Sequence, residues 1–80
     1  MNNLEKYVDV FAETFGVAKD AVESLKYQGI DEWDSVGHMT LVSALEDTFD
    51  IMLETDDIID FSSFEKGKEI LQKYEIDFNK

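Results

Sequence analysis

Residues 4–15 read LEKYVDVFAETF, and this stretch decides the fold class. Its apolar side chains recur at helical positions i, i+3, i+4, i+7, i+8 and i+11, as Leu4, Tyr7, Val8, Phe11, Ala12 and Phe15. This spacing is that of an amphipathic helix with one face in a core. Asn2 followed by Glu5 is typical of a helix start, and Gly16 can adopt the left-handed conformation that ends a helix. We therefore predict a helix over residues 3–15.

The next segment, residues 17–34, shows no sustained apolar period and predicts a long loop, in which residues 20–25 could form a single turn. A connection of this length in a small domain is either functional or pinned by its own side chains. We expect Leu25, Ile30 and Trp33 to be those pins.

A second helix is predicted from Asp34 and Ser35, both good cap residues, to about Phe49. Its core-facing stripe comprises Leu41, Leu45 and Phe49, with His38 and Val42 at the edges. The opposite arc is unusual, because it places two apolar side chains within an acidic frame: Val36, Met39, Ser43, Glu46, Asp47 and Asp50. Single exposed apolar residues are common without any role, but this composition favours a docking surface.

The last third of the chain predicts two further helical pieces. Thr55 is the expected cap of a short piece that ends near Phe61, in which Ile59 is expected to face the core. Residues 62–65 (SSFE) are typical of a capping box that opens a last helix. The inner face of that helix comprises Phe64, Gly67, Ile70, Leu71 and Tyr74, and we expect the tail after Tyr74 to fray.

No alternating strand pattern and no internal repeat interrupts this order, so the predicted fold class is all-α. We expect a small four-helix bundle with three longer helices, one short helix and a long loop between helices one and two. The chain has 80 residues, enough for one domain over 1–80, with the bundle at about 3–75. It contains no cysteine, which excludes disulfide staples and cysteine-ligated zinc.

The formal net charge of −12 disfavours nucleic acid and anionic membranes as partners. No stretch is long and apolar enough for membrane insertion, and the N-terminus lacks the pattern of a signal peptide. We expect a cytoplasmic monomer. The acidity is focal, because residues 31–60 hold ten acidic residues and no Lys or Arg.

The reactive-looking residues lie in the stretch from Asp34 to His38. A serine hydrolase using Ser35 and His38 is improbable, because neither a nucleophile elbow nor a glycine-rich oxyanion loop is visible. The spacing of Asp31, Glu32, Asp34 and His38 fits neither the EF-hand loop nor a histidine-pair zinc motif, so loose association of a divalent ion is the most that we expect there. We predict no catalytic residues and no metal site. The plainest interpretation is that Ser35 caps the second helix and that His38 is a partly packed imidazole.

The chain resembles the acyl carrier proteins. The resemblance rests on Asp34-Ser35-Val36 at the start of an apolar and acidic helix that continues through residues 41–51, on the preceding Phe15-Gly16-Val17, and on the late Ser62-Ser63-Phe64 with Ile70-Leu71. It spans roughly residues 4–74. The motif alone is short, but its combination with the size, the acidity, the long first loop and the helix order is fairly specific.

This resemblance implies a non-catalytic carrier. Ser35 would receive 4'-phosphopantetheine from coenzyme A through a phosphopantetheinyl transferase, with Asp34 as motif residue and helix cap. The arm would carry acyl or aminoacyl groups as thioesters. Enzymes that load and unload the arm would present basic patches, toward which Glu46, Asp47 and Asp50 steer encounter while Val36 and Met39 make the short-range contacts.

Two departures bear on the pathway. Carriers of bulk fatty acid synthesis usually have a glycine and a small residue before Asp-Ser, where this chain has Glu32-Trp33, and an acidic residue after the aliphatic one, where it has Gly37-His38. The pattern resembles discrete carriers of specialised pathways, such as polyketide, surface-polysaccharide or aminoacyl transfer, D-alanyl carriers included. The alternative, motivated by the acidic block, is an acidic helical adaptor or calcium-responsive interaction module without a prosthetic group.

Overall fold

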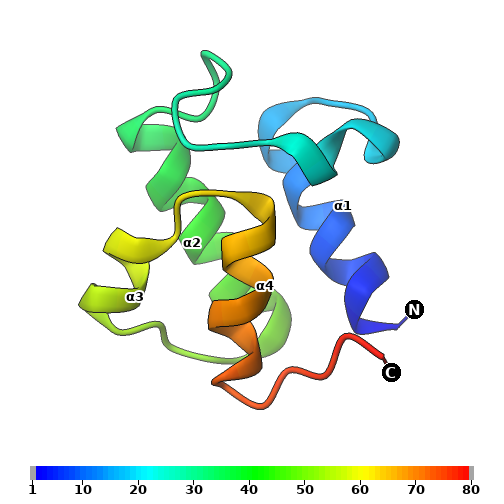
Figure 1. The fold of residues 1–80 in the computed structure, drawn as a ribbon, viewed down its shortest axis with the longest axis vertical. Coiled ribbons are helices and arrows are strands. Elements are labelled where there is room, and N and C mark those ends of the chain that lie inside the picture. The colour runs from blue at the N-terminus through cyan, green and yellow to red at the C-terminus, as the bar shows by residue number, and fades with distance from the viewer. Residues whose placement is uncertain (1, 80) are drawn as a thin grey trace.

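The computed structural model describes residues 2–79 and shows an all-α chain, as predicted (Figure 1). Four α-helices and one 3-10 helix follow each other along these residues: α1 (Asn3–Phe15), η1 (Lys19–Ser24), α2 (Ser35–Phe49), α3 (Thr55–Asp60) and α4 (Phe64–Gln72). The described residues contain no β-strand, only an isolated antiparallel bridge between Lys26 and Ser63. None of the helices within 2–79 combines the length and hydrophobicity needed to cross a membrane.

Helix α1 has the predicted bounds and both predicted caps. The Asn2 side chain accepts a hydrogen bond from the Glu5 N–H at 2.8 Å, and Gly16 ends the helix with φ 65°. These two contacts satisfy backbone groups that a helix leaves free at its ends. Tyr7, Phe11 and Phe15 of the predicted face are buried, but Leu4 is 37% exposed, and Val10, which lies outside that face, is buried.

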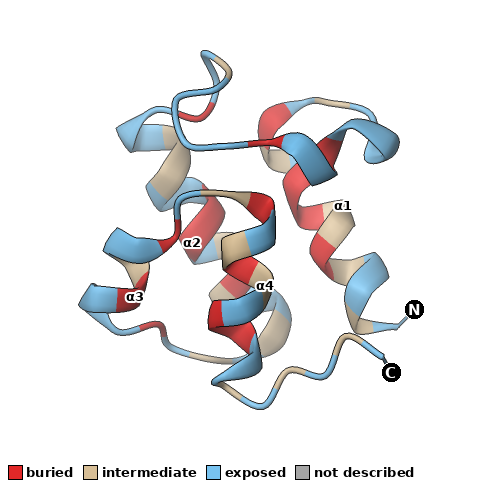
Figure 2. Cartoon of the chain, viewed as in Figure 1, coloured by how far each residue is buried: buried red, intermediate tan, exposed pale blue. Residues whose placement is uncertain are grey.

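An aromatic cluster forms the centre of the core. Phe11 lies in it, with its ring centroid 5.6 Å from that of Trp33 and 5.1 Å from that of Phe64. The Tyr7 hydroxyl donates to the Phe64 carbonyl at 2.7 Å, which satisfies the one polar group of this buried side chain. Burial raises the pKa of Tyr7, so the phenol stays neutral at physiological pH. Figure 2 shows the buried residues on the facing sides of α1, α2 and α4.

The segment between α1 and α2 differs from a plain loop. Residues Lys19–Ser24 form the 3-10 helix η1, where the sequence predicted at most a single turn. Leu25 and Trp33 are buried as expected, and Ile30 is half-buried. The tip closes through a 2.8 Å hydrogen bond from the Gln28 N–H to the Trp33 carbonyl. The predicted pins therefore hold this connection against the core.

Helix α3 contradicts the prediction in two details. Its N-cap is Glu54, without a side-chain cap bond, rather than Thr55. Ile59 is 74% exposed rather than facing the core, while its neighbour Ile58 packs against the core. A helix this short turns only one stripe inward, and the buried residue of that stripe is Asp57.

Asp57 ties α3 to α4 and the residues that follow it. One carboxylate oxygen accepts from the Lys73 ammonium at 2.6 Å and the other from the Tyr74 hydroxyl at 2.5 Å. The hydrogen bond from Lys73, followed by that from Tyr74, holds the pKa of Asp57 below its ordinary value. The same pair raises the pKa of Lys73. The ion pair is thus one of the polar contacts that hold α3, together with the 3.0 Å hydrogen bond from the Glu54 N–H to the Tyr74 hydroxyl.

Helix α4 begins at a different cap from the one the sequence indicated. Ser63, not Ser62, is the N-cap, and its hydroxyl accepts from the Lys66 N–H at 3.0 Å. The predicted box with Glu65 does not form, because Glu65 lies one position too early for the Ser63 cap. The inner face is as predicted, with Ile70 and Leu71 buried.

The C-terminal tail does not fray after Tyr74. Glu75 takes a left-handed conformation with φ 68°, and Ile76 and Phe78 then pack against the core. The Phe78 ring centroid lies 5.2 Å from that of Tyr7, and the Asn3 side chain donates to the Asp77 carbonyl at 2.9 Å. The tail therefore returns to the start of α1, as the neighbouring chain ends in Figure 1 show.

Candidate functional site

The candidate site begins at the first turn of α2, where Asp34 is the helix cap. Its Oδ1 accepts from the Gly37 N–H at 2.8 Å, and its carbonyl accepts from the His38 N–H at 2.8 Å. Ser35 is the first residue inside the helix, and it is exposed. The plain interpretation of Ser35 as the cap is therefore wrong, because Asp34 takes that role. The Ser35 hydroxyl therefore does not make the cap hydrogen bond.

Gly37 lets the preceding loop approach the helix closely. A Cβ atom built on Gly37 would lie 2.0 Å from the Glu32 carbonyl oxygen, a distance that no real side chain tolerates. The absence of a side chain thus allows residues 32–34 to fold directly onto the first turn of α2. This close approach fixes the direction in which Asp34 and Ser35 leave the loop.

The Ser35 hydroxyl has a side-chain partner that sequence reasoning missed. Its Oγ lies 3.1 Å from the Tyr27 hydroxyl, across the loop that connects the two residues. Either oxygen can be the donor, since both groups carry a proton and lone pairs. No sequence signal pairs residues eight positions apart in an irregular loop, so only the fold shows this contact.

His38 is held by two hydrogen bonds, and neither of them joins it to Ser35. Trp33 donates its indole N–H to Nδ1 at 2.9 Å, so Nδ1 carries no proton. Nε2 lies 2.8 Å from the Ile58 carbonyl and therefore donates to it. The expectation of a partly packed imidazole is confirmed. In this arrangement His38 links the loop, α2 and α3.

The outer face of α2 carries the exposed apolar residues that the sequence placed there. Val36 is 76% exposed and Met39 is 52% exposed. A shallow depression on this face is lined by Ser35, Val36, Met39, Thr40 and Ser43. Asp47 and Asp50 are exposed farther along the same helix. We call the surface formed by Val36, Met39, Ser43, Asp47 and Asp50 the α2 face.

Glu46 lies beside the α2 face but has a structural contact. It is half-buried, and its Oε2 accepts from the Leu53 N–H at 2.9 Å. Asp50 ends the helix in the left-handed region with φ 54°. Glu46 therefore supports the turn after α2 with one carboxylate oxygen, and it is less exposed than Asp47 and Asp50.

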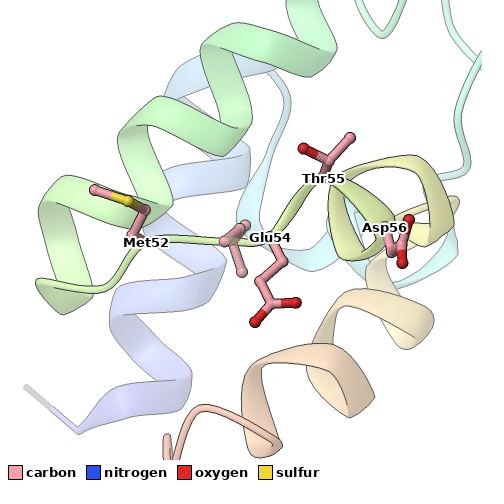
Figure 3. Close-up of a pocket in the computed structure, with 5 residues that line it drawn as sticks. Met52, Glu54, Thr55 and Asp56 are labelled. Carbon is pink, nitrogen blue, oxygen red and sulfur yellow. The ribbon is translucent and has the colours of Figure 1, made fainter.

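Two further exposed apolar side chains lie beyond α2, which the sequence did not indicate. Met52 is 82% exposed on the segment between α2 and α3, and Ile59 is exposed on α3. Figure 3 shows Met52 and Glu54 on this segment and Thr55 and Asp56 at the start of α3; together with Leu53 they line an open depression. Among the described residues 2–79, no group of three or more His, Asp or Glu side chains converges on a point where a metal ion could sit.

Comparisons of the chain with models of known families, with curated proteins and with solved structures gave no match.

Proposed function

We propose that this protein is a carrier that bears acyl or aminoacyl groups on a 4'-phosphopantetheine arm attached to Ser35. The observation that carries this proposal is an exposed serine hydroxyl at the first residue of α2, relieved of capping by Asp34 and bordered by Val36 and Met39. Bound there, the arm would supply a thiol, which this cysteine-free chain lacks, and would carry its cargo as a thioester.

The residues around Ser35 fit a phosphodiester. The first N–H groups of a helix have no intrahelical partner and point toward a group at its N-terminus, where the helix dipole also favours negative charge. The nearest carboxylate, Asp34, is directed to the Gly37 N–H instead of to the Ser35 hydroxyl. Ser35 is exposed, so an arm attached to it can leave into solvent, while Asp34 already takes the N–H groups of Gly37 and His38.

The chain needs no catalytic machinery of its own for the loading step. Ser35 Oγ forms a bond to the phosphorus of the phosphopantetheine moiety, the pyrophosphate bond of coenzyme A breaks, and the adenosine bisphosphate leaves with the electron pair. The serine proton passes to a base of the phosphopantetheinyl transferase, since both nitrogens of His38 are engaged elsewhere. Ser35 is in this account an attachment point and not a catalyst.

The α2 face is the proposed docking surface for the transferase and for the enzymes that load and unload the arm. Its exposed Val36 and Met39 supply contact area beside Ser35, and Asp47 and Asp50 attract basic patches from a distance. Such a small and partly charged interface suits complexes that must exchange quickly. Met52 and Ile59 are further exposed apolar side chains, on the segment after α2 and on α3.

The finer architecture belongs to the same proposal. We propose that α1, α2, α3 and α4 make up the small four-helix bundle expected of a carrier, with η1 as an added turn in its long first connection. We propose a cytoplasmic monomer. Trp33 before Asp34, and Gly37-His38 after Val36, favour a discrete carrier of a specialised pathway over one of bulk fatty acid synthesis.

Intact mass spectrometry tests the proposal. The purified chain is incubated with coenzyme A and a broad-specificity phosphopantetheinyl transferase, and the modified residue is mapped by fragmentation. We expect one arm per chain, located on Ser35, and the same gain in Ser43→Ala, which removes a second exposed serine of the same depression. If the folded protein accepts no arm from two different transferases, the result would contradict the proposal and favour the acidic helical adaptor without a prosthetic group.

A further inference from the structure

Tyr27 meets Ser35 from outside helix α2. Its hydroxyl lies 3.1 Å from Ser35 Oγ. Tyr27 belongs to the loop between η1 and α2. Tyr27 is 36% exposed, so the contact sits at the surface. Any group attached to Ser35 Oγ must therefore leave the serine next to this phenol.

The position of the phenol is fixed from two sides. The Tyr27 backbone N–H donates to the Ser62 carbonyl at 2.9 Å, beside the bridge that joins Lys26 to Ser63. The Tyr27 ring packs edge-on against His38 with 5.3 Å between the ring centroids. His38 is itself held by its two hydrogen bonds. The phenol is thus in place before Ser35 is modified.

Modification of Ser35 changes what the phenol can do. In the free serine either hydroxyl can donate. Once Oγ is esterified to phosphorus it has no proton, and the single negative charge of the diester is shared by the two non-bridging oxygens on that phosphorus, so toward them the phenol can only donate. Hydrogen bonds to an anionic oxygen are shorter and roughly twice as strong as those between neutral groups. Esterification should therefore strengthen the contact.

We infer that Tyr27 is a positioning residue that donates to the phosphodiester at Ser35 and holds the root of the arm beside its phenol. This inference rests on the proposed attachment at Ser35. It assigns to a loop residue a role that Asp34 does not fill, because the Asp34 carboxylate is directed to Gly37. A phenylalanine at position 27 would keep the ring and lose the donor.

The test compares loaded wild-type protein, Tyr27→Phe and Ser24→Ala by phosphorus-31 NMR. Ser24→Ala is the matched control, because it removes an exposed hydroxyl from the same connection, one that bonds only to the Ala21 carbonyl. We expect the phosphodiester resonance to shift and narrow in Tyr27→Phe, and to stay at the wild-type position in Ser24→Ala. Identical resonances in all three loaded proteins would overturn the inference.

A second measurement uses the wild-type protein alone and so does not depend on the folding of Tyr27→Phe. Nuclear Overhauser effects between the Tyr27 ring and the arm methylene next to the phosphate are expected, and their absence would also overturn the inference. Mass spectra of the same samples separate the two proposals. Arms on all three proteins with unchanged resonances reject only the role of Tyr27, whereas no arm on any of them rejects the proposed function itself.

Discussion

The indole N–H of Trp33 donates to Nδ1 of His38 over 2.9 Å, and this bond joins the buried end of the first loop to α2. His38 extends the connection through its 2.8 Å contact with the Ile58 carbonyl on α3. Three segments that surround Ser35 are thereby held by one imidazole. The position of the candidate site thus depends on a core contact that itself takes no part in the proposed chemistry.

Replacing Trp33 by phenylalanine should weaken this link. Trp33→Phe retains an aromatic ring in the core but leaves Nδ1 of the half-buried His38 without its donor. Leaving a buried polar group without its hydrogen-bond partner lowers the free energy of unfolding by about 1–3 kcal/mol. The smaller phenylalanine ring also leaves a cavity, which lowers it further. Urea unfolding measures the change. A variant as stable as the wild type would show that the bond is dispensable.

The Asp57 ion pair predicts a pH dependence of stability. The pKa of Asp57 is lowered in the folded state, so its contribution is fully present above the pKa of about 3.9 of an unfolded aspartate. It is lost as the pH falls through the lower folded-state value. We expect the difference in Tm between the wild type and Asp57→Asn to be constant near neutral pH and to shrink below about pH 4. A difference that persists unchanged in acid would contradict this assignment.

Salt should stabilise the protein. Within residues 2–79 the ion pairs are Asp9 with Lys19 and Asp57 with Lys73, so most acids of residues 31–60 have no cationic partner. Screening then reduces repulsion more than it weakens these two pairs. Calorimetry at increasing sodium chloride should show a rising Tm. A flat or falling Tm would mean that caps and hydrogen bonds satisfy the acids one by one.

Charge reversal on the α2 face should slow loading without unfolding the protein. Asp47 is exposed, so Asp47→Lys is expected to change stability by less than about 0.5 kcal/mol. The mutation should raise the KM of the transferase and reduce the salt dependence of the reaction, because it removes steering toward a basic patch. Glu69→Lys on α4 is the matched control and should behave as wild type. Equal effects of the two variants would indicate only a general influence of net charge.

Local patterns predicted the helices well where one face carries regular apolar spacing. The bounds of α1 and the exposed Val36 and Met39 follow directly from that spacing. The caps of α3 and α4 were each missed by one residue. At α4, the Ser62 carbonyl accepts from the Tyr27 N–H, and Ser63 is the cap. Competing cap residues next to one another cannot be ranked without this long-range contact.

The long-range polar contacts could not be predicted from local sequence patterns either. Nothing in the order of residues joins Tyr27 to Ser35 or Asp57 to Lys73, since each pair depends on how two segments are placed in space. The docked tail was missed because Ile76 and Phe78 are too few to form a periodic pattern. They pack only because the turn at Glu75 directs them back to α1.

The central claim is that Ser35 is the attachment point of the arm, and one comparison tests it most directly. Intact masses of wild type and Ser35→Ala are recorded before and after incubation with coenzyme A and a phosphopantetheinyl transferase, with circular dichroism to confirm that both are folded. The account predicts a gain of one arm in the wild type and none in Ser35→Ala. An arm that still attaches to folded Ser35→Ala, or no gain in the folded wild type, would contradict it.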